Sequence, residues 1–125
     1  MSNKPTAAEL EVLQVLWSKG PTTVKEVNEI LNQKRNVGYT TTLKIMQLMH
    51  EKGMLSREEN GRSHIYTPEI EEKQAQDALV NNLLTTAFEG SAMKLVMQTL
   101  GNNKTSKAEL EKIKEFINKI EEENK

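Results

Sequence analysis

Cysteine is absent from this sequence of 125 residues, aromatic side chains number only five, and the formal net charge is -1. Without cysteine the chain can form no disulfide bond, no thiolate metal site and no catalytic thiol. No apolar run approaches the roughly 18 residues of a membrane-spanning helix. Residues 1–9 contain no apolar segment of a signal peptide, so we expect a cytoplasmic protein. So few aromatic side chains indicate a small core, which favours association between copies of the chain.

The near-zero net charge is the sum of an uneven distribution of charged residues. Before Pro68, which separates two helical patterns, the chain has nine Lys and Arg residues and seven Asp and Glu residues. After Pro68 it has eight basic residues and eleven acidic ones. The interval between Ile30 and His50 contains no acid and three basic residues, namely Lys34, Arg35 and Lys44. A locally basic face, of the kind that binds nucleic acid, can therefore form within residues 1–68.

The first half of the chain shows three helical patterns. Thr6–Glu9 and Thr23–Glu26 each have the spacing of a capping box, in which a hydroxyl and a carboxylate bond the first turn of a helix. Apolar residues follow each box at helical spacing. A third helix is expected from a cap at Thr40 or a neighbouring residue to about Lys52. Its expected inward-facing stripe contains Thr42, Ile45, Met46 and Met49.

A β-hairpin is expected directly after these helices. Met54–Glu59 has the pattern of an extended strand, Asn60–Gly61 is a strong signal for a two-residue turn, and residues 62–67 return. Three helices followed by a hairpin is the order of elements in a winged helix-turn-helix domain. We therefore predict that residues 1–68 form a winged-helix DNA-binding domain, with the hairpin as its wing.

The second half of the chain is expected to be helical, so the fold class is mainly α. Helical patterns cover Ile70–Phe88 and Ala92–Leu100, a loop is expected at residues 101–103, and a third helix follows a capping box at Ser106–Glu109. The segment 92–100 is apolar on nearly every side, which predicts burial on more than one face.

We predict that residues 69–125 form a three-helix dimerisation region. The helix at 70–88 has a wider apolar stripe than one partner helix requires, and three helices with few aromatic residues bury little surface alone. The alternative is a self-contained three-helix bundle. The residues expected at the dimer interface are Leu79, Leu83, Phe88, Met93, Leu95, Val96, Leu100, Ile113, Phe116 and Ile117.

The common enzyme motifs are missing from the sequence. There is no Gly-x-Ser-x-Gly, no phosphate-binding loop and no dinucleotide-binding fingerprint. His50 and His64 do not stand in a metal-ligand pattern, and the acids lie three or four residues from lysines, as on solvated helix faces. We therefore expect no catalytic residue, no metal ion and no cofactor.

The winged-helix pattern places polar residues where they can bind duplex DNA. At the start of the third helix, hydroxyls and backbone amides can bind phosphates or base edges, and side chains on its exposed face can reach the bases. The candidates on this helix are Thr40, Thr41, Lys44 and Gln47. Arg62 and Ser63 at the tip of the wing can contact the phosphates or the minor groove. The alternative is a winged helix that binds only protein partners.

The same segments resemble the penicillinase-repressor family, the BlaI/MecI group of bacterial transcriptional repressors. The similar segments are Ala8–Leu13 with Leu16-Trp17, Tyr39–Leu43, Glu51–Leu55, Gly61-Arg62, Tyr66–Pro68, Phe88–Ser91 with Leu95–Met97, and Ser106–Ile120. The resemblance implies a homodimer that binds a palindromic operator and represses transcription. In the best-known branch of the family, the repressed genes are antibiotic-resistance genes. The resemblance also implies inactivation by a membrane-bound metalloprotease sensor that cleaves the repressor in its dimerisation region. Release by direct binding of a ligand is the alternative.

Two features differ from the family's pattern, and a third observation excludes one branch of the family. Gln98-Thr99 stands where the family's cleavage site is usually Asn-Phe, which makes cleavage there uncertain or implies a protease with another preference. Leu48 stands where many relatives carry Arg, which removes a phosphate contact. The absence of cysteine excludes the copper-responsive branch, whose sensor uses thiolates.

Overall fold

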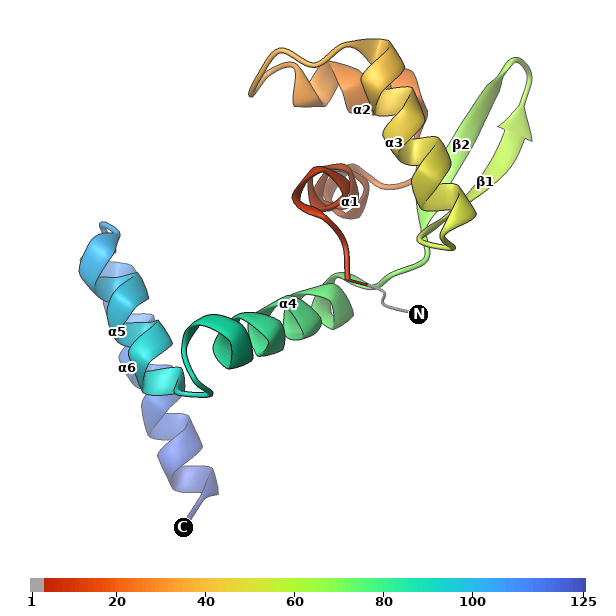
Figure 1. Cartoon of the computed structure of the whole chain (residues 1–125). Helices are drawn as coiled ribbons and strands as arrows, with labels where there is room; N and C mark the ends of the chain where they lie inside the picture. Colours follow the sequence, from red (N-terminus) through yellow and green to blue (C-terminus); the bar gives the residue numbers. More distant parts are fainter. Residues whose placement is uncertain (1–3) are drawn as a thin grey trace. The chain divides into compact units, whose positions relative to one another are not determined.

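The computed structural model describes residues 4–125, which form six helices and a two-stranded sheet (Figure 1). The chain divides into two compact units, the first ending at Asn81 and the second covering Asn82–Lys125. In chain order the elements are α1 (Ala7–Lys19), α2 (Val24–Leu31), α3 (Tyr39–Glu51), β1 (Leu55–Asn60), β2 (Ser63–Pro68), α4 (Glu72–Ala87), α5 (Ala92–Asn102) and α6 (Lys107–Glu123).

Helix α1 begins as the sequence predicts, whereas α2 begins differently. The Thr6 hydroxyl accepts from the Glu9 amide, and the Glu9 carboxylate accepts from the Thr6 amide, which completes a capping box. At α2 the Thr23 hydroxyl accepts from the Glu26 amide, but the Glu26 carboxylate accepts from the Thr22 hydroxyl at 2.6 Å instead. The predicted reciprocal box at Thr23 is therefore only half formed.

The cap of α3, predicted at Thr40 or a neighbouring residue, is Gly38, because the helix begins at Tyr39. The Asn32 side chain bonds both the amide and the carbonyl group of Val37, which holds the turn before the helix. Gly38 then has an extended conformation, and no side chain caps the helix. Thr40 consequently lies in the first helical turn.

The core of the first unit is formed by α1, α2, α3 and the hairpin. Thr42, Met46 and Met49 on α3 are fully buried, as predicted, and Ile45 is partly buried. They pack in one cluster with apolar residues of the other elements, among which the most deeply buried are Val12, Leu13, Leu16, Val27, Leu55 and Tyr66. Thr42 can be buried because its hydroxyl accepts from the Asn28 amide group at 2.8 Å.

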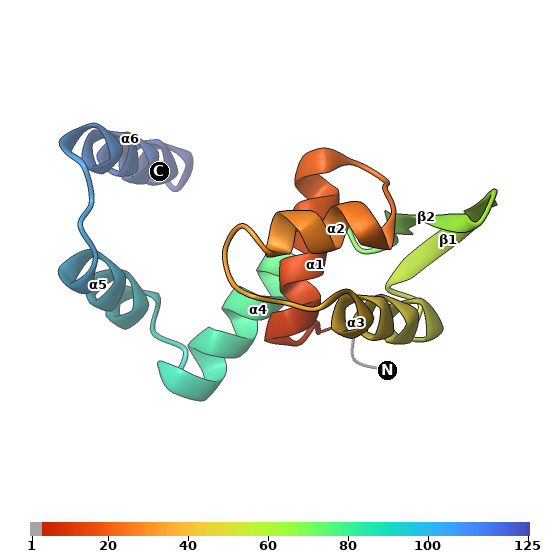
Figure 2. The ribbon, with the colours of Figure 1, turned by 90° about the horizontal axis from the view of Figure 1, so that it is seen from above.

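The wing is an antiparallel hairpin whose turn lies one residue later than the predicted Asn60–Gly61. Asn60 pairs with Ser63, so the two loop residues are Gly61 and Arg62. Gly61 has φ of +67°, which suits the first loop position of a type II′ turn. In Figures 1 and 2 the hairpin extends outward from the three helices. Its register places Arg62 in the loop.

The start of α4 belongs to the first unit. Ile70 and Ala75 are buried in its core, and the indole nitrogen of Trp17 donates to the carbonyl oxygen of Ile70 at 2.9 Å. In the part of the chain that the structure describes, no helix is long and apolar enough to cross a membrane.

The second unit has an exposed apolar surface. None of residues 82–125 is buried, and Met93 and Met97 on α5 leave 68% and 67% of their surface exposed. The predicted burial of α5 on more than one face is therefore wrong for the single chain, because α5 and α6 pack loosely. The predicted loop at residues 101–103 is also wrong, since α5 continues to Asn102. The side chain of Asn103 donates to the carbonyl oxygen of Thr99 and supports this last turn.

Glu9 makes the first unit sensitive to acid. Burial alone raises the pKa of the Glu9 carboxyl group, but the hydrogen bond from Lys52 at 2.7 Å, the bonds to Thr6 and the Lys52 charge outweigh burial. The pKa of Glu9 therefore lies below its usual 4.5. A pKa that is lower in the folded state stabilises the fold above about pH 4.5, and this stabilisation is lost as the pH falls through the folded-state pKa.

We expect Glu9→Gln to lower the free energy of unfolding at pH 7 by about 1 kcal/mol, because Lys52 loses the negative charge of its hydrogen-bond acceptor. The difference from the parent should shrink toward pH 3.5. Urea denaturation at both pH values measures it. Glu11→Gln is the matched control, since the Glu11–Arg35 pair is exposed and should contribute much less. Equal losses in the two variants would contradict the special role of Glu9.

Candidate nucleic-acid interface

The outer face of α3 carries a mostly polar stripe, whose direction is determined by the buried face of the helix. Because Thr42, Met46 and Met49 point inward, helical periodicity places the residues near the opposite side toward solvent. The exposed residues of this stripe are Thr40, Lys44, Gln47, Leu48 and Glu51, which with Leu43 line a shallow groove of about 370 Å³. Three of the predicted DNA-binding residues, Thr40, Lys44 and Gln47, therefore lie together. Thr41 is also exposed, beside this stripe.

The N-terminus of α3 can attract an anion. No acidic residue lies in its first turn, and no side chain caps it. The first amides of a helix have no partner within the helix, and the helix dipole is positive at this end. Thr40 and Thr41 add hydroxyl groups at the same place, so the helix start can bind a DNA phosphate through several donors.

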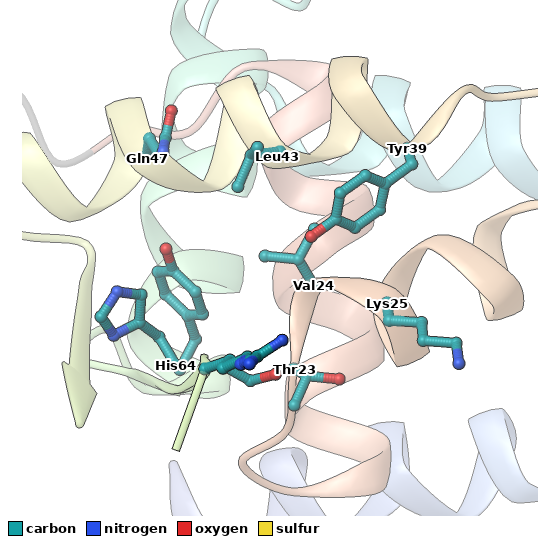
Figure 3. A pocket seen from close by; sticks show the side chains of 10 residues that line it. Thr23, Val24, Lys25, Tyr39, Leu43, Gln47 and His64 are labelled. Carbon is teal, nitrogen blue, oxygen red and sulfur yellow. The ribbon is translucent and has the colours of Figure 1, made fainter. Parts of the chain in front are cut away.

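A cleft of about 150 Å³ separates α3 from the wing and from the start of α2 (Figure 3). Gln47, Arg62 and Ser63, which the sequence predicts as DNA-binding residues, line this cleft together. Its other lining residues are Thr23, Val24, Lys25, Tyr39, Leu43, His64 and Tyr66. Figure 3 shows the Tyr39 hydroxyl pointing toward Val24 and the Lys25 side chain extending away.

Sequence reasoning missed Tyr39, Lys25 and His64 as residues of this surface. Tyr39 is half exposed directly after Gly38, and an exposed aromatic at a helix start was the available signal. Lys25 follows the Thr23 cap of α2. The ring of His64 lies edge-on to Tyr66, and its buried Nδ1 has no hydrogen-bond partner among the described residues.

Ion pairs decide which basic residues are available to a polyanion. Lys19, Arg35 and Lys52 bond to Glu26, Glu11 and Glu9, respectively. The two hydrogen bonds from Arg35 lower the pKa of Glu11, and the Glu11 carboxylate raises the pKa of Arg35. The positive charge of Arg35 is therefore balanced by Glu11, although the sequence places Arg35 in the basic interval.

In the described residues, Lys25, Lys44 and Arg62 form no ion pair. These three basic residues lie at the outer stripe of α3 or at the cleft beside the wing. Basic residues without an ion pair thus lie on the surfaces that winged helices turn toward DNA. No group of three or more acidic or histidine side chains in residues 4–125 could hold a metal ion.

The predicted interface residues of the second unit are exposed or half-buried. Leu95, Val96, Leu100 and Ile113 line an apolar groove of about 260 Å³ together with Thr99. Leu83, Met93, Phe116 and Ile117 are exposed, and Phe88 is half-buried. Leu79 is half-buried in the first unit.

Gln98 and Thr99 lie inside α5, where the Thr99 hydroxyl donates to the carbonyl oxygen of Leu95 at 2.8 Å. The bond between these two residues is therefore helical and exposed. A protease that binds its substrate in an extended conformation has to unwind α5 to reach it.

Comparison with known proteins gives consistent results over nearly the whole chain. The sequence model of the penicillinase repressor family matches residues 5–119. The chain is 26% identical to the penicillinase repressor of Bacillus licheniformis over 110 residues, which cover 88% of this chain and 86% of the relative. It is 22% identical to the methicillin resistance regulatory protein MecI of Mammaliicoccus sciuri over 122 residues, which cover 95% and 99% of the two chains.

Two solved structures resemble the N-terminal part. The DNA-binding domain of the repressor BlaI matches at 30% identity with a TM-score of 0.52, covering 56% of this chain and 85% of that one. The monomeric form of Bacillus licheniformis BlaI in complex with the blaP half-operator matches at 30% identity with a TM-score of 0.50, covering 57% and 87%.

These comparisons confirm the winged-helix fold and the family that the sequence motifs indicate. The relatives are transcriptional repressors rather than enzymes, in agreement with the missing enzyme motifs. The chain belongs to the penicillinase repressor family of DNA-binding transcriptional repressors.

Proposed function

We propose that this repressor acts as a homodimer that occupies a palindromic operator in duplex DNA and blocks transcription by steric occlusion. The observation that carries the proposal is that one chain combines an uncovered polar stripe on α3 with the helices α5 and α6, which contain no buried residue. We assign DNA binding to residues 1–68 and dimerisation to residues 69–125. A repressor of this kind acts in the cytoplasm.

DNA binding is supported by the geometry of the first unit. The stripe of α3 is exposed and mostly polar, and Arg62 and Ser63 of the wing line a cleft together with residues of α3. In winged helices the third helix enters the major groove while the wing contacts the backbone. A BlaI structure with a half-operator supports the same use of this fold.

Dimerisation is supported by the exposed apolar surface of the second unit. Large apolar side chains such as Met93, Val96 and Phe116 remain 68%, 46% and 63% exposed in the single chain. Contiguous apolar surface of this kind marks a protein interface. One winged helix with few free basic residues binds DNA weakly, so two linked copies on two half-sites raise the affinity through effective concentration.

Substitutions on the two DNA-facing surfaces should have different effects. Arg62→Ala should weaken binding to all duplexes alike, by about tenfold, and reduce the salt dependence, because a phosphate contact is lost. Thr41→Ala or Lys44→Ala should change the preferred sequence, at about 1–3 kcal/mol per lost base contact. Gel shifts with duplexes selected from a random pool measure both effects.

Lys34→Ala is the matched control, because Lys34 lines a groove between α1 and α2 rather than the DNA-facing surfaces. It should bind like the parent. If all three test variants also bind like the parent, the interface is misplaced. If the parent selects no duplex even at low salt, the winged helix is a module for protein partners.

Leu95→Asp should convert the dimer to a monomer and abolish tight operator binding, because it places a carboxylate in the apolar groove of α5 and α6. Sedimentation velocity measures the mass. Lys94→Asp is the control, since Lys94 is exposed on α5 and does not line the groove, and it should stay dimeric. Unfolding curves should show that the first unit is intact in both. A dimeric Leu95→Asp protein would overturn the interface.

We further propose that this repressor regulates antibiotic-resistance genes and that a membrane-bound metalloprotease sensor inactivates it. Cleavage between Gln98 and Thr99 would divide the apolar groove, because Leu95 and Val96 lie before the cleaved bond and its other lining residues lie after it. Treatment of the source cells with a β-lactam should then yield a shortened repressor that ends at Gln98, as measured by mass spectrometry. An intact repressor that leaves its operator would instead indicate release by a directly bound ligand.

A further inference from the structure

We infer that Leu48 reads the C5-methyl group of a thymine in the major groove, an inference that rests on the function proposed above. Leu48 leaves 43% of its surface exposed, although it belongs to the unit whose apolar residues form a well-packed core. It is the one apolar residue among the exposed members of the α3 stripe. The packing of the first unit therefore gives no reason for an apolar residue at this exposed position.

Its place on the helix is one that faces bases. Lys44, Gln47, Leu48 and Glu51 follow one another at positions i, i+3, i+4 and i+7. All four are exposed, on the side of α3 opposite the buried residues Thr42, Met46 and Met49. Recognition helices of the homeodomain type contact bases through side chains with this same spacing. Leu48 therefore has the geometry of a base-contacting residue once α3 enters the major groove.

The charges on the C-terminal side of Leu48 favour a base over a phosphate. Glu51, less than one helical turn later, carries a negative charge that repels phosphates. Lys52, the nearest cation toward the end of α3, is bonded to Glu9 at 2.7 Å. The end of α3 beyond Leu48 therefore offers the backbone no free cation, whereas the free Lys44 lies one turn before Leu48. The end of the stripe that follows Lys44 is thus better suited to the edges of the bases than to phosphates.

Thymine is the base whose chemistry matches an exposed Leu. The major-groove edges of the other three bases present hydrogen-bond donors and acceptors, whereas thymine adds a methyl group that apolar side chains contact. Burial of this methyl group against the isobutyl group of Leu48 removes apolar surface of both from water. Leu48 thus specifies thymine at one position of each half-site.

The test uses the full-length protein and a duplex selected from a random pool by the parent. Each thymine is replaced in turn by deoxyuridine, which removes only the methyl group and keeps every hydrogen bond. One replacement should weaken the parent by about fourfold, the factor that corresponds to burial of one methyl-sized group. Leu48→Ala should bind the thymine and uracil duplexes equally, within about 1.5-fold.

Gln47→Ala is the matched control, because it alters the adjacent polar position of the same stripe and should keep the fourfold discrimination. Leu48 is exposed, so Leu48→Ala should unfold at the same temperature as the parent. The inference is overturned if no uracil replacement weakens the parent, or if Leu48→Ala keeps the discrimination. A parent that binds no duplex would overturn the proposed DNA binding itself, which is a separate outcome.

Discussion

Full burial of Thr42, Met46 and Met49 sets the rotation of α3 about its own axis. These residues lie on one side of the helix, and Thr42 is held there by the amide group of Asn28, which also donates to the carbonyl oxygen of Val37. Because a buried hydroxyl needs a partner, this contact fixes both the helix and the turn that precedes it. The outward direction of Thr40, Lys44, Gln47 and Leu48 follows from this packing.

The two units differ in how completely they bury their own apolar residues. The first unit buries its apolar residues in one continuous core. The second leaves residues such as Phe116 and Met97 in solvent, which is costly for a chain that has so few large side chains. In the proposed homodimer a second copy would cover this apolar surface and would double the DNA-binding surface. Stability and operator affinity would then depend on the same contact.

Helical periodicity allowed the helices and the exposed face of α3 to be predicted from the sequence, because the buried stripe of a helix defines its opposite face. Local rules were less successful. The cap of α3 lies at Gly38 rather than Thr40, since the distant Asn28 and the nearby Asn32 hold the turn. The wing turn lies one residue late, because strand pairing overrides the preference of Asn60 for the turn. The cleft beside the wing joins residues far apart in sequence, which no local pattern encodes.

The central claim is that the outer face of α3 and the wing tip contact DNA. Titration of the ¹⁵N-labelled protein with the selected duplex tests it most directly, by the change in each amide resonance. The account predicts large changes for residues 39–48 and 61–64, and small ones in α6, which carries no proposed DNA contact. Changes confined to the groove between α1 and α2, or to residues 82–125, would contradict it.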